Sequence, residues 1–142
     1  TDIRMTRFMI TLEQGVELVF SAFEDSMGGE IYVKKIPSMN IVDLAKVVVP
    51  DAKHKIIGIR PGEKLHEQMI STEDSFHTFE YENYYKILPS IYNCSRESQR
   101  INGGKKCQEG FSYASDTNTE WMSVETLQKW MESEFGSAVN SK

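Results

Sequence analysis

The sequence has few of the features that define several broad functional classes. No apolar run approaches the roughly 20 residues of a membrane span, and we expect neither a span nor a signal peptide. A formal net charge of −5 provides no general basic face of the kind that binds nucleic acid. With 39% apolar and 26% charged residues, the 142-residue chain can bury the core of one domain. We therefore expect a soluble, globular, cytoplasmic protein.

Signatures of catalysis and metal binding are also scarce. The two cysteines, Cys94 and Cys107, could form one bridge, but two free thiols are the usual state in the cytosol. Glu63-x-x-His66-Glu67 would place a glutamate and a histidine on one helix face, yet the chain has no second half-site of that spacing. The chain contains no nucleophile elbow and no G-x-G-x-x-G turn for a dinucleotide. We expect no catalytic, metal-binding or cofactor-binding residue in this chain.

Hydrophobic spacing and capping residues predict a mixed α/β fold. After an extended opening segment, apolar side chains recur at helical spacing over residues 11–25, and a short strand follows over 30–33. Asn40 can cap a second helix whose expected buried face is Ile41, Leu44, Ala45 and Val48. Residues 38–40 are expected to form a loop before it. We expect a strand over 54–59 and a shorter helix around Leu65 and Met69.

The second half of the chain is less regular. Residues 78–81 and 85–88 are typical of two short strands around Glu82-Asn83, and residues 90–110 of a long loop or insertion. Ser123 can cap a final helix with apolar residues at helical spacing. We expect one domain over residues 1–135 and a flexible tail over 136–142. Exposed apolar faces on such a piece would favour oligomers.

Arg60-Pro61-Gly62-Glu63 indicates a rigid turn. Proline fixes φ and glycine tolerates unusual backbone angles. A guanidinium held on such a turn can fork onto two phosphate oxygens, and the carboxylate three residues later can accept from sugar hydroxyls. The alternative is an ordinary Pro-Gly turn in which Arg60 and Glu63 form a surface ion pair.

Several motifs, taken in order, resemble a known enzyme family. The Arg-Pro-Gly-Glu turn is similar to one in extended short-chain dehydrogenases/reductases that act on nucleotide sugars. The combination resembles the inverting UDP-N-acetylglucosamine 4,6-dehydratases, with three further matches before the turn and one after it: residues 5–16 (MTRFMITLEQGV), 28–33 (GGEIYV), 36–41 (IPSMNI) and 113–121 (YASDTNTEW).

The resemblance implies roles for six residues. Arg7 and Arg60 would contact the ligand diphosphate, and Glu63 the ribose, although a carboxylate at a helix start also has a capping role. Met5, Thr6 and Phe8 would line the nucleotide, although an edge strand packed into a core needs the same residue types. Arg7 could instead be an exposed arginine beside Asp2 or Glu13.

The same resemblance implies that part of the enzyme lies elsewhere. None of the six tyrosines has a lysine four residues on, so the family's catalytic Tyr-x-x-x-Lys is missing, as is its glycine-rich turn. We expect a substrate-binding, C-terminal portion that binds UDP-sugar but no NADP by itself. The parent would be an NADP-dependent lyase with an N-terminal Rossmann portion, a homo-oligomer that makes a 4-keto-6-deoxy UDP-sugar for surface glycans. The alternatives are a UDP-sugar epimerase, a dehydratase/5-epimerase of capsule synthesis, and a stand-alone non-catalytic binding module.

Overall fold

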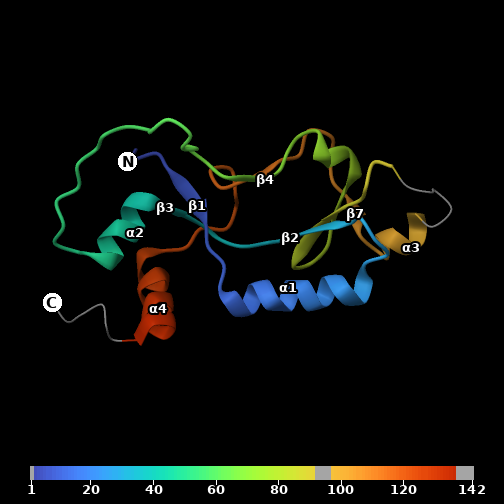
Figure 1. Cartoon of the computed structure of the whole chain (residues 1–142), viewed down its shortest axis with the longest axis horizontal. Coiled ribbons are helices and arrows are strands. Elements are labelled where there is room, and N and C mark those ends of the chain that lie inside the picture. Colours follow the sequence, from blue (N-terminus) through green and yellow to red (C-terminus); the bar gives the residue numbers. More distant parts are fainter. Residues whose placement is uncertain (1, 92–96, 137–142) are drawn as a thin grey trace. The chain divides into compact units, whose positions relative to one another are not determined.

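The computed structural model describes residues 2–91 and 97–136 (Figure 1). Their contacts form two compact units, each built from separate stretches of the chain. The first unit comprises residues 2–9, 37–67 and 115–136, and the second comprises residues 10–36, 68–91 and 97–114. The chain therefore passes from one unit to the other four times, after residues 9, 36, 67 and 114.

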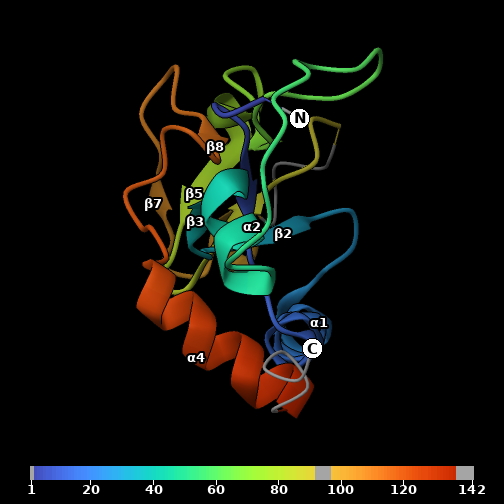
Figure 2. The ribbon, with the colours of Figure 1, turned by 90° about the vertical axis from the view of Figure 1, so that its left-hand side faces the viewer.

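In the described residues, the first unit contains a strand pair and two helices: β1 (Thr6–Phe8), β3 (Ser38–Asn40), α2 (Ile41–Val48) and α4 (Val124–Phe135). The two strands are antiparallel, with Arg7 opposite Met39. Asn40 caps α2, because its side-chain oxygen accepts the N–H of Val42 at 2.8 Å. The helices α2 and α4 pack together (Figure 2) over a core whose buried members are Met39, Val47 and Leu127.

The second unit is built around a four-stranded antiparallel sheet in the order β2-β6-β5-β7. These strands are β2 (Ile31–Lys34), β6 (Tyr84–Ile87), β5 (Thr78–Glu80) and β7 (Lys105–Lys106). A separate antiparallel pair joins β4 (Gln68–Ile70) to β8 (Tyr113–Ala114). The 3-10 helix η1 (Asp74–His77) and the short helix α3 (Glu97–Ile101) complete this unit.

The longest helix of the second unit, α1 (Leu12–Asp25), lies beside β2. A capping box fixes its start: Thr11 Oγ1 accepts the Gln14 N–H, and Gln14 Oε1 accepts the Thr11 N–H, each at 3.1 Å. No residue of α1 is buried. The helix therefore gains little from burial and depends on its cap and on contacts along one side.

Much of the predicted mixed α/β fold is confirmed. The helices expected over 11–25, after Asn40 and after Ser123 are α1, α2 and α4. The strands expected over 30–33, 78–81 and 85–88 are β2, β5 and β6, with ends that differ by a residue. Cys107 carries a free thiol, as expected. Cys94 and residues 137–142 of the expected tail lie outside the described residues.

Two expected elements are wrong. Residues 54–59 form no strand, because they pair with no other strand of the described residues. Most of them are exposed. The helix expected around Leu65 is also missing, and the chain there continues into β4. Its backbone groups bond to distant segments: the Leu65 carbonyl accepts the Thr6 N–H at 3.1 Å, and the Glu67 N–H donates to Ser115 Oγ at 2.9 Å. These long-range bonds replace those that a helix would make within itself.

Three smaller expectations also need correction. Residues 38–40 form a strand rather than a loop, because they pair with β1. In α2 the buried valine is Val47, whereas Val48 is 41% exposed; Leu44 of the expected face does pack against the core. The expected loop over 90–110 contains α3 and β7 in its described part, where β7 pairs with β5.

Candidate functional site

Arg7 fastens a distant segment to β1. Its Nη1 donates to the carbonyls of Thr6, at 2.6 Å, and Leu65, at 3.3 Å. Its Nη2 donates to the Lys64 carbonyl at 3.0 Å, and its Nε lies 3.5 Å from Glu67 Oε1. A guanidinium has five N–H donors in a rigid fork. Most of the fork of Arg7 is therefore engaged in holding residues 64–67 against β1.

A polar network joins the same segment to the chain after β8. Thr6 Oγ1 lies 2.8 Å from His66 Nδ1 and 2.7 Å from Ser115 Oγ. Ser115 and Glu67 also exchange hydrogen bonds: the Glu67 N–H donates to Ser115 Oγ, and the Ser115 N–H donates to the Glu67 carbonyl at 2.8 Å. Ser115 is fully buried and its hydroxyl is engaged, so it is no exposed nucleophile. The network positions His66, whose Nε2 lies 3.9 Å from Asp116 Oδ2.

The Arg60 turn has the rigid geometry that its sequence predicts. The Glu63 N–H donates to the Arg60 carbonyl at 3.0 Å, and Gly62 has a φ of 85°, in the region that favours glycine. Glu63 Oε2 accepts the Arg60 N–H at 3.0 Å, which closes the turn from the other side. Arg60 Nε lies 3.9 Å from Glu63 Oε1, and the Arg60 side chain is 68% exposed. The turn therefore presents a guanidinium to solvent with one long ion pair.

Comparison with known proteins assigns the chain to a family. A sequence model described as "Polysaccharide biosynthesis protein" matches residues 1–89. The chain belongs to the polysaccharide biosynthesis protein family. It is 55% identical over 132 residues to a UDP-N-acetylglucosamine 4,6-dehydratase (inverting) from Campylobacter jejuni strain 81-176, an alignment that covers 89% of this chain and 40% of that protein.

The chain is also similar to two further proteins. The chain is 35% identical over 133 residues to a UDP-glucose 4-epimerase from Rickettsia akari, with 91% of this chain and 39% of that protein covered. The crystal structure of Pen from Bacillus thuringiensis matches with a TM-score of 0.75 and 28% identity, over 95% of this chain and 39% of that one. The chain thus spans about two fifths of the length of the curated relatives it matches.

The residues expected to bind substrate in this family member lie in different surroundings. Arg7 contacts neither Asp2 nor Glu13 in any described ion pair; it contacts Glu67, and Asp2 pairs with Arg4. Glu63 is not at a helix start, because the chain there forms a turn. The roles of Arg7, Arg60 and Glu63 in ligand binding stay predictions.

The expected nucleotide lining on β1 is largely covered. Met5 and Thr6 are only 3% and 5% exposed, and Phe8 is partly buried. Met5 is as buried as it would be in an edge strand that packs into a core, which is the alternative to a nucleotide lining. Of the three, Phe8 has the most side-chain surface for a ligand, and the lining also stays a prediction.

The sequence reasoning overlooked a buried cluster in the second unit. Lys86 on β6 is fully buried, and its Nζ lies 2.5 Å from Asp25 Oδ2 and donates to the Arg100 carbonyl at 2.6 Å. The ring of Tyr81 lies 4.9 Å and that of Tyr32 5.6 Å from this ammonium. The sequence signal that could have predicted this cluster is a lysine among the aromatic and apolar residues of 84–87. The cluster joins α1, β6 and α3 and leaves the ammonium no opening to a ligand.

The pKa values of Asp25 and Tyr81 are shifted by burial and by their neighbours in this cluster. Burial raises the pKa of Asp25, but hydrogen bonds from Lys86, Tyr32 and Asn102 outweigh it and lower that pKa below its ordinary value. Burial, with a smaller contribution from the Asp25 charge, raises the pKa of Tyr81 to about 12. Both shifts favour an ionised carboxylate beside neutral phenols near neutral pH.

The described part of the chain contains no group of three or more histidine, cysteine, aspartate or glutamate side chains placed to hold a metal ion. It also contains no helix with the length and apolarity needed to cross a membrane.

Proposed function

We propose that this chain anchors the uridine diphosphate of a sugar nucleotide within a longer UDP-N-acetylglucosamine 4,6-dehydratase. The product would be a 4-keto-6-deoxy UDP-sugar for surface glycans. The observation that carries the proposal is the 55% identity, over 89% of this chain, to the inverting dehydratase of Campylobacter jejuni. The exposed guanidinium on the Arg60 turn supports it, because such a group can bind a diphosphate.

In this proposal Arg60 makes the direct contact with the diphosphate. The turn limits the positions of its backbone, so only the side chain has to be ordered when its planar fork meets two phosphate oxygens. Glu63 already accepts the Arg60 N–H through Oε2, and its Oε1 can accept a ribose hydroxyl. Arg7 holds residues 64–67 in place, and its positive charge would add to the attraction for the diphosphate. Anchoring of this kind fixes the sugar for chemistry carried out elsewhere.

The chain's residues do not fit a dinucleotide. NADP sites of this kind use a glycine-rich turn at a helix N-terminus, and the sequence contains no G-x-G-x-x-G. The helices α1, α2 and α4 start instead at the caps Thr11, Asn40 and Ser123. We place the NADP site in an N-terminal Rossmann portion of the longer protein, which we propose to be a cytoplasmic homo-oligomer.

Replacement of Arg60 tests the proposed anchor. In the full-length dehydratase we expect Arg60→Ala to raise KM for UDP-N-acetylglucosamine about 10- to 100-fold, because a hydrogen bond to a charged group contributes about 1.5–3 kcal/mol. The melting temperature should not change, since the side chain is exposed. Lys53→Ala is the matched control, because Lys53 is an exposed cation of the same unit. An unchanged KM in Arg60→Ala, or an equal rise in both variants, would contradict the anchoring role.

The second candidate is a UDP-sugar 4-epimerase. The 35% identity to the Rickettsia akari UDP-glucose 4-epimerase, over 91% of this chain, favours it as an alternative. The products separate the two activities, because dehydration loses water and leaves a 4-keto sugar, whereas epimerisation returns an isomer of equal mass. Mass spectrometry of the product from UDP-N-acetylglucosamine and from UDP-glucose therefore decides between them.

A further inference from the structure

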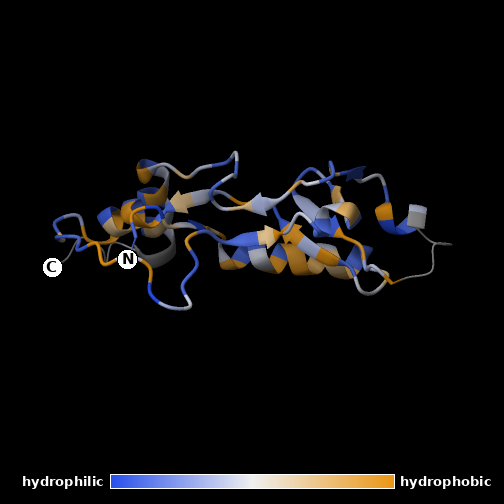
Figure 3. Cartoon of the chain, turned by 90° about the horizontal axis from the view of Figure 1, so that it is seen from above, coloured by the Kyte–Doolittle hydropathy of each residue, from blue (hydrophilic) through white to orange (hydrophobic). Residues whose placement is uncertain are grey.

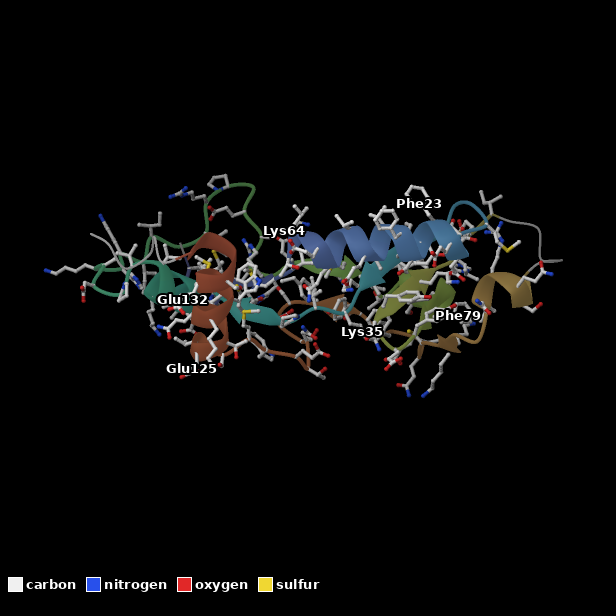
Figure 4. The ribbon with its side chains drawn as sticks, turned by 90° about the horizontal axis from the view of Figure 1, so that it is seen from below. Phe23, Lys35, Lys64, Phe79, Glu125 and Glu132 are labelled. Atoms are coloured by element: carbon white, nitrogen blue, oxygen red, sulfur yellow. The ribbon has the colours of Figure 1, made fainter. Side chains whose placement is uncertain are left out.

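The helix α1 carries an apolar face that no part of its own unit covers. Leu12, Phe20 and Phe23 are 78%, 64% and 79% exposed, and Val16 and Val19 lie on the same side. Figure 3 shows the hydrophobic colouring along this helix, and Figure 4 shows Phe23 directed away from the strands of its unit. These side chains border an open hollow of about 610 Å³ that extends to Ile10. Contiguous exposed apolar surface of this kind marks an interaction site.

The opposite side of α1 is attached to the second unit. On that side Asp25 pairs with Lys86 and accepts the Tyr32 hydroxyl at 2.7 Å, and Glu17, at the border between the two sides, lies 3.6 Å from Lys34. The helix is therefore fixed with its polar side toward its own sheet. Because these contacts fix the helix, its apolar face points away from the sheet of its own unit.

The charges on α1 limit what can cover this face. The helix contains four acidic residues, Glu13, Glu17, Glu24 and Asp25, and no lysine or arginine. At 3.6 residues per turn, Glu13, Glu17 and Glu24 form a row along one border of the apolar face. A second copy of α1 would bring like charges together, and an anionic membrane surface would repel them. Complementarity instead favours a protein surface with apolar side chains bordered by lysine or arginine.

We propose that this face of α1 is the docking surface for the part of the longer protein that lies outside this chain. The inference rests on the proposed function, in which that part carries the dinucleotide site. The chain covers only 40% of its dehydratase relative, so a protein of that length has more than enough additional surface to cover one helix face. The covering surface is apolar and has basic residues beside Glu13, Glu17 and Glu24.

Photo-crosslinking in the full-length protein tests this docking. We would replace Phe23 with the photo-reactive p-benzoyl-phenylalanine, irradiate the protein, and map the crosslinked peptides by mass spectrometry. The matched control has the same replacement at Phe76, a 51% exposed phenylalanine of the same unit on η1. We expect Phe23 to crosslink several-fold more than Phe76, within one chain, to a peptide outside residues 1–142 that contains lysine or arginine.

Other outcomes would overturn the proposal. Crosslinks between two copies would make the face a self-association surface, and crosslinks confined to residues 1–142 would mean that this chain covers it. A yield no higher than at Phe76 would mean that nothing docks there. Product formation is assayed on unirradiated wild-type protein. The expected crosslink in a protein without dehydratase activity would overturn the proposed function and leave the docking intact.

Discussion

Replacing Asp25 with alanine is expected to leave the buried ammonium of Lys86 without its carboxylate. Lys86 would keep the Arg100 carbonyl at 2.6 Å and the faces of two tyrosine rings, but none of these carries a formal negative charge. Removing one partner of a buried ion pair costs about 3–5 kcal/mol. The Asp25 side chain is 19% exposed, so water can reach the vacated position, and we expect the lower end, about 3 kcal/mol.

A double-mutant cycle separates the ion pair from other effects. Asp25→Ala/Lys86→Met removes both charges and fills the space of the lysine stem with a thioether. We expect the double variant to be more stable than Asp25→Ala by about 2 kcal/mol, because no charge is then left buried alone. The assay is urea unfolding followed by far-ultraviolet circular dichroism. A loss below about 1 kcal/mol in Asp25→Ala, or purely additive effects, would refute the reasoning.

The same variant has a defined pH dependence. The pKa of Asp25 is lower in the folded protein than in the unfolded chain, so the carboxylate stabilises the fold above the unfolded value of about 3.9. That contribution is lost as the pH falls through the lower folded pKa. We therefore expect the stability difference between wild type and Asp25→Ala to be constant near neutral pH and to shrink below about pH 4. A difference that grows on acidification would contradict this sign.

Two further predictions concern glycine and tyrosine. Gly15→Ala should raise the free energy of unfolding by about 0.5–1 kcal/mol, because a Cβ in α1 meets no atom within 4 Å; Gly104→Ala should lower it, because a Cβ there would lie 2.4 Å from the Tyr81 ring. Urea unfolding of both variants checks this contrast, and equal effects would contradict it. The raised pKa of Tyr81, about 12, predicts stability that is full below about pH 10 and lost toward pH 12. Tyrosinate absorbance of wild type and Tyr81→Phe measures the shift, and an ordinary pKa for this phenol would refute it.

The elements predicted correctly are those whose signals are local. Thr11, Asn40 and Ser123 each precede a helical pattern directly, so the cap and the apolar spacing could be seen within a few residues. The rigid Arg60 turn was predicted for the same reason, because Pro61 and Gly62 lie inside it. Family and fold class were also predictable, because the motifs that carry the resemblance remain clear in the sequence.

The elements predicted wrongly depend on partners far along the chain. Residues 54–59 have the composition of a strand but have no partner strand among the described residues, and the segment from Leu65 to Glu67 bonds to Thr6 and Ser115 instead of forming a helix. The engagement of the Arg7 guanidinium could not be seen either, because its acceptors on residues 64 and 65 are 57 and 58 positions away. Periodicity reports on neighbours within a turn or two, and these contacts are set by the tertiary fold.

The alternation of the chain between its two units fixes when each can be completed during synthesis. Every stretch of the second unit has been made once residue 114 is joined, whereas the first unit still lacks α4 and its core residue Leu127. The strand β1 is made before every other described element of this chain but belongs to the unit that is finished last. A nascent chain halted before residue 124 would contain all four strands of the sheet in the second unit, while the first unit still lacked α4. Met39 and Val47 would then lack Leu127, the third buried member of their core, until α4 had been made.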